Sequence, residues 1–168
     1  MVPSGDSLRG VVALIRPGEA TDVVAAVDVF ERSNLARRQG DWPNRTPRLK
    51  RLRAHLADPA SWFLVAEERS SLVAMASAAP LWGESGAGSV TPGGCFLGYL
   101  FVAPERWGEG IGGAVLDAVI AEAKRRHYSR IHLWTNEDNE RSHRLYRSRG
   151  FSRTGQAEDR QEEWARAI

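Results

Sequence analysis

Apolar positions follow two spacings along this chain, one typical of strands and one typical of helices. Short apolar runs bounded by turn-forming residues predict strands. Such runs occupy residues 10–15, 62–67, 72–81, 95–102, 130–134, 151–156 and 163–168. Apolar residues three or four positions apart predict amphipathic helices. These occupy residues 23–35, 46–56, 111–123 and 139–149.

Turn and capping residues separate these segments. Thr46 and Pro47 are typical of a helix N-cap followed by the first helical position, and Pro59 stops that helix. Gly150 is placed as a C-terminal stop for the last helix. Residues 83–94 hold five glycines, two serines and a proline, which predicts a loop. It is either a hairpin tip or a lid over a substrate, and the tip is favoured. The predicted order is β-α-α-β-β-β-α-β-α-β-β.

The length of 168 residues fits a single compact domain spanning residues 1–168. A content of 42% hydrophobic and 26% charged residues argues against a disordered chain. No run of about 18 apolar residues occurs, which excludes a membrane-spanning helix and predicts no membrane partner. The N-terminus lacks the charged-then-apolar order of a secretion signal, and a single Cys95 suits a reducing compartment. We therefore expect a cytoplasmic protein.

Positive charge is unevenly distributed, although the net charge is only +2. That total is too small to indicate a nucleic-acid partner, and we predict none. Residues 124–153 hold nine Lys or Arg against three acids, and residues 32–53 hold eight against one. Either these are solvated helix faces, or they surround a ligand that carries several phosphates.

A glycine-rich segment follows the strand at 95–102 and opens the next helix. Backbone N–H groups of such a turn, together with the helix dipole, favour an anion. The alternative is a glycine-rich helix start without a ligand, which we disfavour because glycines destabilise a helix. Its glycines are Gly108, Gly110, Gly112 and Gly113.

Three of these glycines also satisfy the dinucleotide fingerprint G-x-G-x-x-G, with Glu137 at the end of the next strand. However, five residues separate the strand from the first glycine, where the fingerprint needs a tight turn. Too little chain follows for a doubly wound nucleotide domain. A nicotinamide-dependent enzyme is therefore a distant alternative.

The segment Leu100-Phe-Val-Ala-Pro-Glu-Arg-Trp-Gly-Glu-Gly-Ile-Gly-Gly113 resembles the acyl-CoA-binding motif of the GNAT acetyltransferase superfamily. Residues 139–151 resemble its second motif, N-x-x-A/S-x-x-L/F-Y-x-x-x-G-F. The resemblance covers residues 95–156 and implies an α/β (α+β) fold. In that fold about four helices flank a mixed, mostly antiparallel sheet of six to seven strands. Trp107 departs from the family, which usually has Gln or Arg there, and this puts one side-chain contact in doubt.

The resemblance implies acetyl-CoA as the acyl donor and assigns residues to it. The pantetheine arm would pair with the backbone of Leu100, Phe101 and Val102. The pyrophosphate would be held by backbone amides of Gly108, Glu109, Gly110, Ile111, Gly112 and Gly113. Arg106 could meet the 3′-phosphate, although a solvated surface residue is the more ordinary interpretation.

Asn139, Ser142 and Tyr146 lie at spacings that place them on one helix face, where core packing would prefer apolar residues. By resemblance, Asn139 and Ser142 would contact the cofactor and Tyr146 would lie near the thioester sulfur. A tyrosine titrates near ~10 and a thiol near ~8.5, so Tyr146 would stay protonated and could protonate the departing thiolate. The alternative is a buried tyrosine bonded to a backbone carbonyl.

Other chemistry is less well defined. The general base is open among Glu67, Glu84, Glu105 and Asp138, and an acceptor of low pKa would need none. Cys95 is expected to be a small core residue rather than a nucleophile. The four histidines form no spaced ligand set, so we predict no metal.

The acceptor is the least defined part. Trp82, Tyr99 and Trp134 fall near strand ends that could face it, and residues 45–53 form an Arg-rich helix where the family builds the acceptor wall. A solvated face is the default interpretation of that helix, and an anionic acceptor is the alternative.

We predict an N-acetyltransferase that acts on a primary amine of a small molecule by direct attack in a ternary complex. The alternatives are a protein or peptide acceptor and a non-catalytic acyl-CoA-binding module. Related proteins commonly form homodimers, although no residue here demonstrates one.

Overall fold

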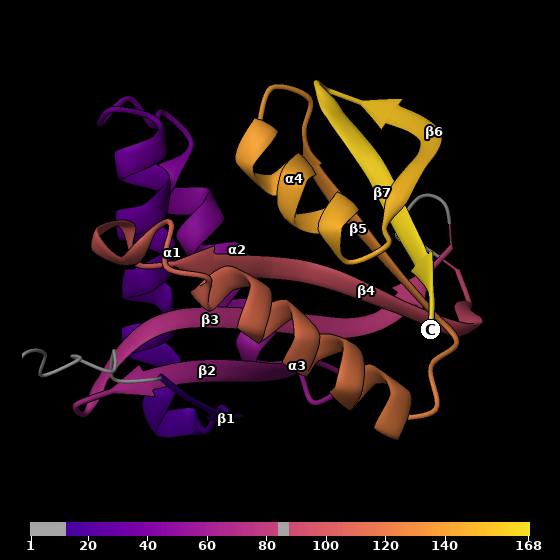
Figure 1. The fold of residues 1–168 in the computed structure, drawn as a ribbon, viewed down its shortest axis with the longest axis horizontal. Helices are drawn as coiled ribbons and strands as arrows, with labels where there is room; N and C mark the ends of the chain where they lie inside the picture. Colours follow the sequence, from indigo (N-terminus) through magenta and orange to yellow (C-terminus); the bar gives the residue numbers. More distant parts are fainter. Residues whose placement is uncertain (1–12, 84–87) are drawn as a thin grey trace, which may run out of the picture.

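The computed structural model describes residues 13–83 and 88–168 and is built on a seven-stranded sheet (Figure 1). The strands lie in the order β1-β2-β3-β4-β5-β7-β6, and only the β4–β5 pair is parallel. Their bounds are β1 (Leu14–Pro17), β2 (Trp62–Glu68), β3 (Ser71–Trp82), β4 (Val90–Val102), β5 (Arg130–Asn136), β6 (Ser152–Glu158) and β7 (Gln161–Ala167). The sheet is therefore mixed and mostly antiparallel, as predicted.

Four α-helices cover the sheet: α1 (Val23–Arg37), α2 (Arg45–Ala57), α3 (Ile111–Arg125) and α4 (Glu140–Ser148). Single 3-10 turns precede α1 and α3, at η1 (Ala20–Asp22) and η2 (Pro104–Arg106). None of the helices in the described ranges is long and apolar enough to cross a membrane.

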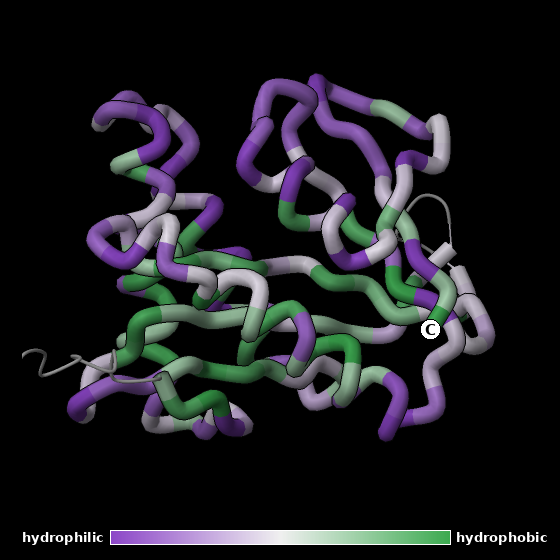
Figure 2. The backbone as a smooth tube through the Cα atoms, viewed as in Figure 1, coloured by the Kyte–Doolittle hydropathy of each residue, from purple (hydrophilic) through white to green (hydrophobic). Residues whose placement is uncertain are grey.

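Alternation along the central strands separates two hydrophobic clusters. Leu64 and Ala66 of β2 face the cluster that contains α3 and the Tyr146 ring, whereas Val65 between them faces α1 and α2. Helices α1 and α2 therefore cover one face of the sheet, and α3 covers the other. Figure 2 shows the hydrophobic stretches along β2, β3, β4 and α3, while β6 at the sheet edge is mostly hydrophilic and exposed.

The parallel strands β4 and β5 pair over only four residues, from Gly94 to Leu97 on β4. Beyond Leu97 they diverge, and Figure 1 shows β5 leaving β4 on the way to α4. Gly98 lies where the β3–β4 register shifts, because Ser77 pairs with Tyr99 while Ala78 pairs with Leu97. Among the described strands, none therefore borders this edge of β4 from residue 98 to residue 102. The gap positions the functional site.

Three predicted boundaries need correction. Helix α2 begins at Arg45 with Asn44 as its N-cap, two residues before the predicted Thr46 cap, and Asn44 makes no side-chain cap bond. Strand β4 begins at Val90, which pairs with Trp82, so cross-strand pairing extends into the predicted loop of residues 83–94. That pairing favours the hairpin interpretation over a lid, although residues 84–87 lie outside the described chain. The first strand covers Leu14–Pro17 and so ends two residues beyond the predicted end at residue 15, while residues 10–12 of that prediction lie outside the described chain.

Candidate active site

Two cavities meet where β4 and β5 diverge. The larger, here called the α3 cavity, has a volume of about 570 Å³ and lies between the end of β4, the start of α3, and α4. Of the predicted cofactor-site residues, all except Glu109 line it: Leu100, Phe101, Val102, Gly108, Gly110, Ile111, Gly112, Gly113, Asn139, Ser142 and Tyr146. The Glu109 carboxylate instead bonds the Arg106 guanidinium at 2.6 Å.

The N-terminus of α3 forms one wall of the α3 cavity. Gly110 is its N-cap and no side chain caps it, so the N–H groups of the first turn have no partner within the helix. Gly108 and Gly110 both have φ of +82°, a left-handed conformation that glycine adopts without strain. The Ala114 N–H then donates to the Gly110 carbonyl at 3.1 Å and begins the helical pattern. This arrangement favours an anion at the helix start.

Trp107 stands where the GNAT superfamily, which this motif resembles, usually has Gln or Arg. Its indole lies against the end of β4. Its Nε1–H donates to the Val102 carbonyl at 2.9 Å. The Arg141 guanidinium stacks on the indole, 4.2 Å from the ring centroid. Trp107 thereby holds a cation in the cavity wall, a contact that the sequence analysis did not predict.

Three arginines line the α3 cavity, and they differ in their charge environment. Arg106 pairs with both Glu68 and Glu109. Arg37 and Arg141 have no carboxylate within 4.0 Å in the described part of the chain. The charges of Arg37 and Arg141 are therefore available to a ligand.

Asn139 lies one residue outside α4, because its side chain caps the helix. Its Oδ1 accepts a hydrogen bond from the Ser142 backbone N–H at 3.3 Å. The predicted helix start at residue 139 is thus moved to Glu140. Asn139, Ser142 and Tyr146 still line the same cavity wall, as their spacing predicted.

Tyr146 is buried, with 7% of its surface exposed, and lines both cavities. Burial raises the pKa of its phenol above the ordinary value of 10.0. Within residues 13–83 and 88–168 its hydroxyl has no hydrogen-bond partner, so the alternative of a tyrosine bonded to a backbone carbonyl finds no support there. The ring is held by packing on Phe151, with centroids 5.8 Å apart.

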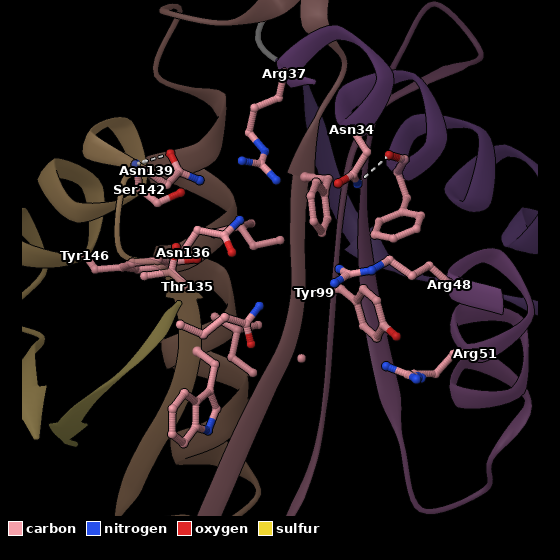
Figure 3. A pocket seen from close by; sticks show the side chains of 17 residues that line it. Asn34, Arg37, Arg48, Arg51, Tyr99, Thr135, Asn136, Asn139, Ser142 and Tyr146 are labelled. Carbon is pink, nitrogen blue, oxygen red and sulfur yellow. Dashed lines mark hydrogen bonds between the residues drawn. The ribbon is translucent and has the colours of Figure 1, made fainter. Parts of the chain in front are cut away.

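The smaller cavity, here called the α2 cavity, has a volume of about 150 Å³ and lies between α1, α2, β4 and β5 (Figure 3). It shares six lining residues with the α3 cavity: Arg37, Leu100, Phe101, Asn139, Ser142 and Tyr146. The two cavities are therefore contiguous, and Tyr146 lies at their junction.

Three guanidinium groups line the α2 cavity, from Arg37 of α1 and from Arg48 and Arg51 of α2. Figure 3 shows Arg37 reaching into the gap from α1, with Arg48 and Arg51 on the wall beside Tyr99. With the Asn136 amide oriented to suit its neighbours, its oxygen accepts from the two terminal nitrogens of Arg37 at 3.0 and 3.3 Å. No Asp or Glu of the described chain lines this cavity.

Tyr99 lies on the same wall and is held by aromatic contacts. Its ring packs edge-on against Phe30, with centroids 5.6 Å apart, and lies 5.2 Å from His55. Burial raises the pKa of the Tyr99 phenol, while the charges of Arg51 and Arg48 oppose that rise. Trp134 also lines the cavity, whereas Trp82 lies at the exposed hairpin and lines neither cavity.

None of the proposed general bases that the structure describes reaches either cavity. Glu67 pairs with Arg16, Glu105 with Arg32, and Asp138 with Arg160. Glu84 lies outside the described residues. No described carboxylate is therefore placed to take a proton from an amine in the α2 cavity.

Cys95 is a core residue, as expected. It is fully buried, and burial raises the pKa of its thiol to about 12. A protonated, inaccessible thiol is a poor nucleophile. No group of three or more His, Cys, Asp or Glu that could hold a metal occurs in residues 13–83 and 88–168.

Sequence reasoning missed several lining residues. Asn34, Arg37 and Asn136 were not singled out, because each lies on an amphipathic element whose polar side is indistinguishable from a solvated face. The only available signal was the excess of positive charge in residues 32–53, which contain Asn34 and Arg37.

The family model described as the acetyltransferase (GNAT) family matches residues 27–151 of this chain. The chain therefore belongs to the GNAT family, which confirms the resemblance drawn from its two motifs. No curated protein sequence matches it.

Solved structures share the fold at low sequence identity. PaiA N-acetyltransferase from Thermoplasma acidophilum, solved with coenzyme A, has a TM-score of 0.73 at 15% identity, covering 93% of this chain and 99% of that chain. The ribosomal-protein-S18-alanine N-acetyltransferase from Escherichia coli has a TM-score of 0.72 at 19% identity, with 93% and 94% covered. YncA from Salmonella typhimurium, solved with its cofactor acetyl-CoA, has a TM-score of 0.70 at 20% identity, with 92% and 93% covered. The predicted fold is confirmed by these likenesses.

Proposed function

We propose that this chain transfers the acetyl group of acetyl-CoA to the primary amine of a small molecule, by direct attack while both substrates are bound. Family membership supplies the acetyl transfer and its donor. The proposal that the acceptor is a small amine, attacked while both substrates are bound, rests on the two cavities that meet at Tyr146. The α3 cavity has the uncapped N-terminus of α3 in its wall, and the α2 cavity has no carboxylate among its described lining residues.

The groups that line the α3 cavity suit the parts of acetyl-CoA. First-turn N–H groups of Ile111, Gly112 and Gly113 would hold the pyrophosphate. The open edge of β4 at Leu100 and Phe101 would pair with the extended pantetheine arm, whereas the Val102 carbonyl already accepts from Trp107. Because Arg106 is neutralised by two carboxylates, Arg141 is the better candidate for the 3′-phosphate.

Tyr146 is the proposed general acid. Acetyl-CoA, when bound, supplies its acetyl group as a thioester, whose carbonyl carbon an amine can attack. The Tyr146 hydroxyl would give its proton to the sulfur as the C–S bond breaks and negative charge develops there. Its raised pKa makes a lasting phenolate costly. The proton lost by the attacking nitrogen would therefore replace the one that Tyr146 gives up.

The α2 cavity would receive the amine, which must be neutral in order to attack. Without a carboxylate among the described lining residues, the amine would lose its proton to water before it binds. A peptide α-amine titrates near ~8 and a simple alkylamine near ~10, so the neutral fraction of a small amine is limited at physiological pH and rises with pH. Attack by this neutral fraction requires no dedicated base, and the rate should rise with pH up to the pKa of the amine.

The volume of the α2 cavity supports a small acceptor. A space of about 150 Å³ is comparable to one that holds a ligand of benzene size. Protein N-termini remain the alternative acceptor, because one of the similar folds is named as an alanine N-acetyltransferase of a ribosomal protein.

The test is amine-dependent thiol release from acetyl-CoA by the full chain, with the N-acetyl product identified by mass spectrometry. We expect thiol release with at least one small primary amine and an equal amount of product. Release with a peptide N-terminus alone would replace the small-molecule acceptor. Binding of acetyl-CoA without release from any amine or peptide would indicate a non-catalytic acyl-CoA-binding module.

A further inference from the structure

We infer that the acceptor carries an anionic group, a carboxylate or a phosphate, besides its amine, and that Arg48 and Arg51 bind this group with help from Arg37. The inference rests on the proposed function and adds the substrate class to it. It is carried by the placement of three guanidinium groups around the α2 cavity.

The charges of these arginines are not balanced within the described chain. No carboxylate of residues 13–83 and 88–168 lies within 4.0 Å of Arg37, Arg48 or Arg51. Helix α2 itself contains no acidic residue. By contrast, Arg125 and Arg126 at the end of α3 share the Glu122 carboxylate at 2.6 and 2.7 Å. The α2 cavity therefore gathers three cations without a carboxylate, unlike the paired arginines at the end of α3.

The fold holds these cations close together. Arg48 and Arg51 are three residues apart and lie on one face of α2. Arg48 is half-buried, and both burial and the nearby charges of Arg38 and Arg51 lower the pKa of its guanidinium. Repulsion of this kind is relieved when an anion binds between the cations. Guanidinium groups also match carboxylate and phosphate oxygens with paired N–H donors.

The coenzyme is a poor explanation for Arg48 and Arg51. Neither lines the α3 cavity, whose own cations include Arg106 and Arg141. Arg37 lines both cavities and could bind either substrate. Substitutions at Arg48 and Arg51, which line only the α2 cavity, therefore distinguish an effect on the acceptor from an effect on the coenzyme.

The same positive field selects against one class of amine. A polyamine or an aminoglycoside would bring further positive charge into a cavity that has no described carboxylate to receive it. The field also disfavours the protonated form of the acceptor amine, which is the form that cannot attack. An acceptor that brings its own anion therefore suits both the binding and the chemistry.

The closing experiment measures thiol release at saturating acetyl-CoA with amines matched in pairs. Each pair differs by one anion: glycine with glycinamide, phenylalanine with phenylalaninamide, and phosphoethanolamine with ethanolamine. Because the anion also raises the pKa of the amine, kcat/KM is calculated from the concentration of neutral amine in each case. Spermidine and kanamycin form the cationic arm. We expect kcat/KM to be at least ~10-fold higher for the anionic member, as a charge-assisted hydrogen bond implies. The preferred pair then distinguishes a carboxylate from a phosphate.

Variants test whether these arginines are responsible. Arg48→Gln and Arg51→Gln should each lower kcat/KM for the anionic amine by roughly 10-fold, mainly through KM. The loss should be clearly smaller with the neutral member of each pair, and the Kd of acetyl-CoA should remain unchanged, because neither residue lines the α3 cavity. Arg53→Gln is the matched control, since Arg53 lies on the same helix, is exposed and lines neither cavity. Thermal melts establish that each variant is folded.

Preference for the neutral or cationic amines would overturn the inference, and so would equal losses with charged and neutral amines in both variants. Absence of thiol release from every amine would contradict the proposed function instead. In that case, calorimetric binding of the same pairs to the chain saturated with CoA still tests the inference. Tighter binding of the anionic members, lost in Arg48→Gln, would support it, and equal or undetectable binding would refute it.

Discussion

The two cavities that meet at Tyr146 are built from different parts of the chain. The α3 cavity depends on backbone groups, namely the uncapped start of α3 and the open edge of β4. The α2 cavity depends on side chains, above all the guanidinium groups of Arg37, Arg48 and Arg51. A common donor can be bound by backbone geometry, whereas a particular acceptor needs particular side chains.

The two cavities therefore differ in how freely their residues can be substituted. Gly108 and Gly110 have positive φ, so most other residues would strain the turn that opens α3. Arginines on the exposed side of α2 meet no such backbone constraint. The acceptor side can therefore change without disturbing the donor side, and the predictions below test this independence.

The largest effect is expected from Gly112→Asp at the start of α3. A Cβ at Gly112 would meet Leu145 and Val102 at 3.6 Å, an ordinary contact, so the fold should accept the change. Like charges 4 Å apart repel by about 4 kcal/mol at an effective dielectric of 20, so the Kd of acetyl-CoA should rise on the order of 1,000-fold. An acidic residue in the first turn of a helix is stabilising, so the Tm without ligand should hold or rise.

Calorimetry and thermal melts measure the two quantities separately. Ala121→Asp introduces the same charge on an exposed position of α3, about 13 Å further along the helix axis, and should change the Kd less than ~2-fold. Normal binding of acetyl-CoA by Gly112→Asp would show that the helix start does not hold the donor.

Next in size is Tyr146→Phe, which tests the junction between the cavities. Loss of a general acid should lower kcat by roughly 100-fold. The Kd of acetyl-CoA and the Tm should change little, because the hydroxyl has no partner among the residues that the structure describes. Tyr128→Phe, at a tyrosine that lines neither cavity, is the matched control. An unchanged kcat would remove Tyr146 from the chemistry.

Cys95 lies in the core where β4 and β5 still pair, and it lines neither cavity. We therefore expect its titration to change the free energy of unfolding with pH but not the activity. Its thiol pKa of about 12 exceeds the unfolded value near ~8.5. The stabilising contribution is therefore full below pH ~8.5 and is lost as the pH rises toward 12, by up to about 1.4 kcal/mol per pH unit.

Cys95→Ala should abolish this alkaline slope and leave kcat unchanged. Urea melts between pH 8 and 10 measure the slope, and the wild-type chain is the reference at each pH. A loss of activity in folded Cys95→Ala would assign the thiol a role that its burial argues against.

The smallest effect is expected from Trp107→Phe, which changes a side chain in the wall of the α3 cavity, where backbone groups are expected to bind the donor. Phe keeps a ring under Arg141 but cannot donate to the Val102 carbonyl, so unfolding should cost about 1 kcal/mol less. The Kd of acetyl-CoA should rise only a few-fold. Urea melts measure the change, and Trp82→Phe at the exposed hairpin serves as control. A large loss of acetyl-CoA binding would mean that the donor side depends on this side chain after all.

The donor side was largely predictable from sequence because backbone-built sites constrain residue type. The spacing of Asn139, Ser142 and Tyr146 predicted one shared helix face, and in the structure all three line the α3 cavity, while the glycines marked the start of α3. The roles assigned to these residues stay predictions. Thr46 was wrong as the N-cap of α2, because helix ends shift by one or two residues where no side chain bonds the helix end, and here the shift is two.

The acceptor side could not be predicted in the same way. Arg37 lies about one helix away in sequence from Arg48, and only the antiparallel return from α1 to α2 brings them to the same cavity. The Arg-rich pattern of residues 45–53 is equally compatible with a solvated face. Asn136 was invisible for another reason, since its partner Arg37 is almost 100 positions earlier in the chain.

Direct transfer requires that both substrates are bound together, one on either side of Tyr146. Initial rates measured while acetyl-CoA and an anionic amine are both varied test this requirement. We expect intersecting double-reciprocal lines and no acetylated protein when acetyl-CoA is added alone. Parallel lines, with the chain gaining the mass of an acetyl group, would contradict it and require a covalent intermediate.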